Sequence, residues 1–174
     1  MDQRSALEEL SSGWASRTAF LGSAEFTAPY GRRFPGLASA ASVPLPAAEL
    51  QQAVSGLPPG YMGLVAARTA ADIPATVGWS TFGSDNAGPG ARSLAITAVL
   101  RSWEARFGAR LLQIGADSVL RVLVERPPRT AEHAQQIAAE HIAFADGFDG
   151  ESGSTVVSRA ASIVGAPIWS FWWD

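Results

Sequence analysis

The sequence predicts an α+β protein, in which a mostly antiparallel sheet is packed with helices. Three observations support this prediction. Residues 61–174 alternate between strand-like and helix-like hydrophobic patterns. Two apolar runs, at 109–115 and 118–125, are joined by a turn so short that the two strands must form an antiparallel hairpin. The chain ends in IWSFWWD, which predicts a Trp-rich C-terminal strand in the sheet.

Composition divides the chain near residue 60. Residues 1–60 are expected to form an N-terminal arm of low regularity, because much of this stretch is rich in Ser, Ala, Gly and Pro and shows little periodicity. A short helix is expected near 46–55, where Pro46 suits a first helical turn and Gly56 supplies a stop. Residues 61–174 are expected to form a single α+β domain.

The first elements of this domain are a predicted strand and two predicted helices. Tyr61 to Ala67, YMGLVAA, is a compact apolar run that suits a buried strand. A brief helix is expected after it, with Asp72 as cap and Pro74 inside the first turn. A longer helix is predicted over 91–108, ended by Gly108. Its inward stripe consists of Ile96, Val99, Leu100, Trp103 and Phe107.

Two more helices and the terminal strand complete the prediction. Thr130 is expected to cap a helix that runs to about Ala145, and a last helix is expected over 154–164. In the terminal strand Trp169, Phe171 and Trp173 point to one face. Burying each aromatic contributes on the order of 2 to 3 kcal/mol, so this face is expected in the core. The alternative is an exposed recognition strip.

Charge and composition exclude several classes of partner. The formal charge is −3 and every basic residue is arginine, so there is no broad cationic surface for nucleic acid. The absence of cysteine excludes disulfides and thiolate metal sites. No apolar run is long enough to cross a bilayer, and the first residues do not resemble a secretory signal. We expect a cytoplasmic protein without membrane contact, metal or cofactor, and the oligomeric state stays open.

The candidate catalytic residues are His141, Glu140 and Asp146. An imidazole and carboxylates can pass protons or share a metal, although this spacing is not a known ligand signature. The other histidine, His133, lies eight residues before His141, roughly 12 Å along a helix, so the two cannot ligate one ion. His141 also falls on the apolar face of its helix, where a neutral structural histidine is the alternative.

The candidate binding residues are Trp79, Arg106 and Asp174. Asp174 carries both a side-chain carboxylate and the terminal carboxylate of the chain as given. Arg106 or Arg110 could bind this doubled negative end by bidentate hydrogen bonds.

Several motifs occur in an order that resembles a known bacterial family. They are RTAADIPATVGW (68–79), VLRSWEARFGARLLQIGADSVLRVLVERPPRT (99–130), AAEHIAF (138–144) and the terminal WSFWWD. Over about residues 61–174 the chain resembles the family catalogued as domain of unknown function 4253. The resemblance implies a fold but no established activity. Relatives commonly carry Phe-Cys-Pro-Asp and then Trp-Gln after the third motif, and here FADGFDGESG keeps only Phe144 and Asp146 of that pattern.

Two functions remain open from the sequence. The first is a non-catalytic protein-binding or interaction domain, because core motifs are strong, catalytic motifs are weak, and aromatic residues are spaced along the N-terminal arm. The alternative is a small enzyme, of hydrolase or tailoring type, that uses His141 with Glu140 or Asp146.

Overall fold

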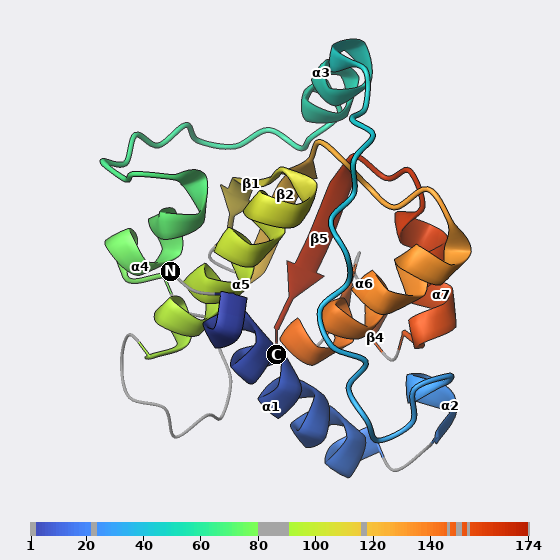
Figure 1. Ribbon diagram of the computed structural model, residues 1–174. Coiled ribbons are helices and arrows are strands. Elements are labelled where there is room, and N and C mark those ends of the chain that lie inside the picture. The colour runs from blue at the N-terminus through green and yellow to red at the C-terminus, as the bar shows by residue number, and fades with distance from the viewer. Residues whose placement is uncertain are drawn as a thin grey trace.

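The protein is an α+β fold, as the sequence predicts, in which an antiparallel sheet is packed with helices in a computed structural model (Figure 1). The described part of the chain comprises residues 3–21, 24–79, 91–115, 118–145, 147–148, 151–152 and 154–173. Within these described residues the sheet has five strands, in the order β1-β2-β5-β3-β4.

The hairpin and the C-terminal strand form the main part of the sheet. The three strands of this main part are β1 Ala109–Ile114, β2 Val119–Val124 and β5 Ile168–Trp172. The two short strands β3 Gly147–Phe148 and β4 Glu151–Ser152 lie at one edge of the sheet. β2 pairs antiparallel with both β1 and β5, and β3 meets β5 at Trp172. The C-terminal strand therefore lies in the middle of the sheet, between the hairpin and the short pair.

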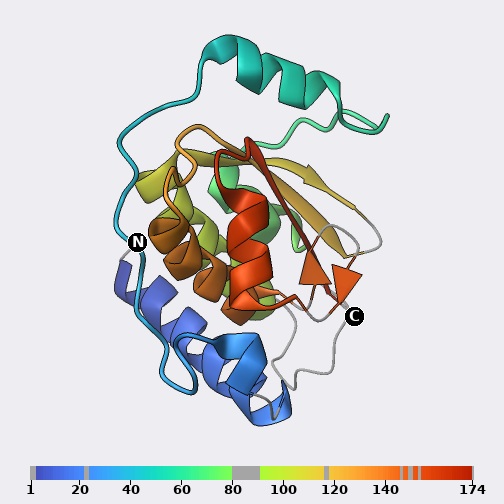
Figure 2. The ribbon, with the colours of Figure 1, turned by 90° about the vertical axis from the view of Figure 1, so that its right-hand side faces the viewer.

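The helices pack around this sheet, and Figure 2 shows α6 and α7 on the same side of β5. Their bounds are α1 Gln3–Leu21, α2 Ala24–Thr27, α3 Ala47–Ser55, η1 Ala70–Asp72, α4 Ile73–Val77, α5 Ala91–Phe107, α6 Ala131–Phe144 and α7 Val156–Ile163. The side chain of Thr130 caps α6 by accepting from the backbone N–H of His133 at 3.3 Å. Thr155 and Ser158 form a capping box at the start of α7.

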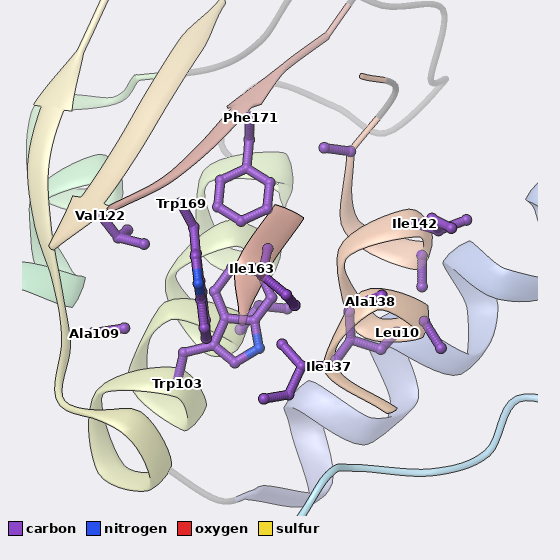
Figure 3. Packing of buried hydrophobic residues seen from close by; sticks show 14 of the residues in the cluster. Leu10, Trp103, Ala109, Val122, Ile137, Ala138, Ile142, Ile163, Trp169 and Phe171 are labelled. Carbon is purple, nitrogen blue, oxygen red and sulfur yellow. The ribbon is translucent and has the colours of Figure 1, made fainter. Parts of the chain in front are cut away.

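The core is aromatic and centres on Trp103 of α5. Figure 3 shows Trp169 and Phe171 projecting from β5 into the same interior as Trp103. The Trp103 ring stacks on Phe171 at 5.2 Å between centroids and meets Trp169 edge to face at 5.7 Å. Both geometries are favourable for aromatic quadrupoles.

The predicted core face of the terminal strand is confirmed. Trp169, Phe171 and Trp173 are all buried, and the indole N–H of Trp173 donates to the carbonyl of Phe144 at 3.0 Å. Trp172 points to the other face, opposite Val119. The aromatic end of the chain is thus a central structural element.

The predicted buried strand at Tyr61 to Ala67 is wrong. Tyr61, Met62 and Leu64 are 107%, 91% and 96% exposed, and the stretch has no strand. Within the described part of the chain its backbone makes a local bond, from Ala67 N–H to the carbonyl of Val65, in place of a ladder. An apolar run predicts burial, but a strand also needs a neighbour that pairs with it.

The N-terminal stretch is more regular than the sequence predicts. Helix α1 spans 19 residues and packs against α5 and α6, with Leu10 and Trp14 in the core. Its buried residues Ala6, Leu10 and Trp14 recur every four positions, which is a helical spacing that the Ser- and Ala-rich composition concealed. Helix α3 lies where a short helix is predicted near 46–55.

Candidate functional site

Glu140 lies at the centre of a buried polar cluster. Its carboxylate is fully buried and accepts hydrogen bonds from both terminal nitrogens of the Arg106 guanidinium. Nη1 donates to Oε1 and Nη2 donates to Oε2, each at 2.7 Å. The indole N–H of Trp103 donates to Oε2 at 2.8 Å, and the backbone N–H of Ala38 donates to Oε1 at 2.7 Å. Arg106 also donates to the carbonyl of Ala38 and to Ser102 Oγ. The cluster therefore holds a bidentate ion pair whose oxygens are already hydrogen-bonded.

The coil between α2 and α3 bonds to this cluster at Ala38. In Figure 1 this coil passes in front of α6. Besides Ala38, it bonds to α5 through the Ala41 N–H and the Arg106 carbonyl at 3.1 Å, and to α6 through the Ser39 carbonyl and His133 Nε2 at 2.8 Å. Arg106 and Glu140 consequently connect three segments that are far apart in the sequence.

His141 lies in an aromatic cage on the other side of Trp103. Its centroid is 4.6 Å from Trp169, 4.9 Å from Phe171 and 5.1 Å from Trp103, and the ring is fully buried. Nδ1 accepts a hydrogen bond from Arg159 Nε at 3.1 Å, which places the proton of the neutral ring on Nε2. Burial, together with the positive charges of Arg159 and Arg106, lowers the pKa of His141 well below its ordinary value.

The two adjacent residues of α6 do not converge on one site. Successive helical residues point about 100° apart, so Glu140 faces Arg106 whereas His141 faces Arg159 and β5. Trp103 separates them, since its N–H binds Glu140 and its ring faces His141 edge-on. No substrate atom can reach both groups without opening the core. The third candidate, Asp146, lies outside the described residues.

Two of the candidate binding residues, Trp79 and Arg106, also have internal partners. The half-buried Trp79 donates its indole N–H to the carbonyl of Gly115 at 3.2 Å and meets Trp173 edge to face at 6.0 Å. The guanidinium of Arg106 is held by Glu140, as described above, which the sequence did not predict. Asp174, its expected partner, lies outside the described residues. Arg110 is exposed.

The sequence analysis predicted neither the buried hydrogen bonds of Arg159 nor the bond from the Ala38 backbone to Glu140. Arg159 is buried in α7, where it donates to His141 and, from Nη2, to the carbonyl of Ser170 at 3.3 Å. Its position three residues after Val156 places it on the inward face of α7, which was a usable signal. Nothing in the sequence around Ala38 indicates that its backbone would bind a carboxylate 102 positions away.

Exposed apolar side chains gather along one stretch of the chain. We call Val43, Val54, Tyr61, Met62, Leu64 and Val65 the 43–65 surface, and all six are exposed. Beside α3 lies a hollow of about 250 Å³ lined by Leu50, Gly108, Arg110, Leu123 and Glu125. Among the large hydrophobic residues of the described segments, Tyr61, Met62 and Leu64 have the highest exposed fractions.

Metal and membrane signatures are not found in the described segments. No group of three or more His, Asp or Glu side chains there is arranged to hold a metal ion. None of the helices described combines the length and hydrophobicity needed to cross a membrane.

Of the comparisons with known proteins, the one with family models gave a match. Neither the curated proteins nor the solved structures gave a match. The family described as Domain of unknown function (DUF4253) matches residues 61–174, which contain α5, α6, α7 and the whole sheet. The chain belongs to this DUF4253 family.

Proposed function

We propose that this protein is a non-catalytic protein-binding domain that uses the 43–65 surface. The observation that carries the proposal is the exposure of Tyr61, Met62 and Leu64, three large apolar side chains within four positions. Several large apolar side chains exposed so close together in the sequence are a typical mark of interaction sites. Tyr and Met are also enriched at protein interfaces relative to the rest of the surface.

The internal bonding of the polar candidates supports the same proposal. Glu140 has two arginine nitrogens, an indole and a backbone N–H on its carboxylate, and His141 is enclosed by aromatic rings. A general acid or base must come within hydrogen-bond reach of its substrate. The enzymatic alternative, in which His141 acts with Glu140 or Asp146, therefore has less support than a binding role.

The test compares two triple variants as bait. In the surface variant, Tyr61, Met62 and Leu64 are each replaced by Ser. In the control variant, Val77, Leu94 and Val157, which are 47%, 55% and 54% exposed on other helices, are each replaced by Ser. Proteins cross-linked to each bait in the native host are identified by mass spectrometry, purified, and titrated against wild type and both variants.

We expect a purified partner to bind wild type and the control variant equally and to bind the surface variant at least about tenfold more weakly. Equal binding to all three baits would reject this surface as the binding site. Failure to recover any direct binder in repeated cross-linking would count against a protein-binding function.

A further inference from the structure

We propose that the 43–65 surface is covered by a second copy of this chain, in a dimer with two-fold symmetry. This inference rests on the proposed binding function and names its partner. In a two-fold interface the same patch occurs on both partners, so the patch must be complementary to itself. The charges beside the surface meet this requirement, and its exposed area is large enough for a specific dimer.

The exposed area is large enough for a specific dimer. Tyr61, Met62 and Leu64 are almost completely exposed, and side chains of this size present on the order of 150 Å² each. Two copies that bury these side chains, with the half-exposed Val43, Val54 and Val65, would remove on the order of 1,200 Å² from water, which is the lower end for specific interfaces. A monomer would leave this apolar area in water.

The hollow beside α3 supplies charges of both signs. Arg110 and Glu125 line it together with the apolar side chains of Leu50 and Leu123. Under two-fold symmetry, Arg110 of one copy can pair with Glu125 of the other, and the reverse pair forms at the same time. A partner of uniform charge would leave one of these groups opposed by a like charge.

The surface is bonded to the folded body near its first residue. The backbone N–H of Leu45 donates to the carbonyl of Glu125 at 2.8 Å, and Leu45 itself is buried. Gly60, directly before Tyr61, lies near β1, since a methyl group added there would lie 3.8 Å from Gln113 Nε2. The surface therefore begins on the same part of the fold as the hollow that Glu125 lines.

The first measurement is sedimentation velocity of the full chain, from about 1 to 100 µM. We expect wild type and the control variant to move from the 18.2 kDa monomer toward twice that mass as concentration rises. The surface variant is expected to remain monomeric, or to dissociate at a concentration at least about tenfold higher. Circular dichroism melting verifies that all three chains are folded.

The second measurement uses charge exchange. Arg110→Glu and Glu125→Arg should each weaken the dimer, because each places like charges opposite one another. The double variant restores both pairs with exchanged signs, and we expect its dissociation constant to return toward the wild-type value. Additive weakening in the double variant would overturn the two-fold pairing.

The outcomes separate this inference from the proposed function. A wild-type chain that stays monomeric at 100 µM overturns the second copy as partner, whereas a cross-linked foreign protein that needs Tyr61, Met62 and Leu64 still supports a binding domain. A dimer that is equally strong in the surface variant overturns the 43–65 surface as its interface.

Discussion

Glu140 and Arg106 show how a charged pair can be stable inside an apolar core. Two buried charges are costly unless their geometry is good and their remaining hydrogen-bonding atoms are satisfied. Both conditions hold, because the pair is bidentate and Ala38, Trp103 and Ser102 supply the additional bonds. Glu140 and Arg106 thus join α5, α6 and the coil at Ala38, which are far apart in the sequence.

Removing one charge of this pair should destabilise the fold strongly. Glu140→Gln leaves the Arg106 guanidinium buried without its counter-charge, and we expect a loss of about 3–5 kcal/mol in the free energy of unfolding. Urea denaturation measures the change, with Glu9→Gln on the exposed side of α1 as the control. A loss below about 1 kcal/mol for Glu140→Gln, comparable with the control, would contradict the role assigned to the pair.

His141 should give the folding free energy a specific pH dependence. Its pKa is lowered in the folded state, mainly by burial, whereas an unfolded histidine titrates near about pH 6.5. Below that pH the unfolded chain binds one proton more than the folded chain. The contribution of His141 to the free energy of unfolding therefore falls by up to about 1.4 kcal/mol per pH unit until the pKa of the folded state is reached. Above about pH 6.5 the contribution is constant.

The variant His141→Asn isolates this effect, because asparagine keeps an acceptor for Arg159 but does not titrate. We expect the free energy of unfolding of wild type to fall more steeply than that of the variant as the pH is lowered from about 6.5 to 5. Parallel curves for the two chains would mean that the folded and unfolded pKa values are equal.

At the scale of elements, α1 crosses α6 at a glycine. A Cβ added at Gly13 would lie only 2.0 Å from the carbonyl oxygen of Ala143, so the two helices approach each other through backbone. In a helix, Gly→Ala ordinarily stabilises by about 1 kcal/mol. Here the same change must push α1 away from α6.

We therefore expect Gly13→Ala to lower the melting temperature, against the helix propensity, and to expose α1 to proteolysis. Ser12→Ala, at the exposed neighbouring position, is the matched control and should be neutral or slightly stabilising. A rise in melting temperature for Gly13→Ala would show that α1 does not pack on α6 through this residue.

The elements with clear periodicity were predictable, and those determined by distant neighbours were not. Helix α5, the 109–125 hairpin and β5 follow from hydrophobic spacing and from turn and cap residues. The exposure of Tyr61 could not be predicted, because hydrophobicity indicates which residues favour burial and does not supply a partner. The Glu140 pair was equally inaccessible, since Arg106 and Ala38 lie 34 and 102 positions away.

At the scale of the whole molecule, the hydrophobic core of the described chain extends beyond the family domain. The family match covers residues 61–174, yet Leu10, Trp14 and Ala38 belong to the same hydrophobic core. Ala38 also bonds to both members of the Glu140–Arg106 pair. Residues before 61 therefore complete the core and cover the polar cluster.

The central claim is that Glu140 and Arg106 form a closed internal connection. The most direct test is urea unfolding of residues 61–174 alone against the full chain. We predict that the shortened chain lacks a cooperative transition, because it loses Leu10 and Trp14 from the core and Ala38 from the carboxylate. A cooperative transition within about 1 kcal/mol of the full chain would contradict the claim, since the pair would then persist with its outer side open to a ligand.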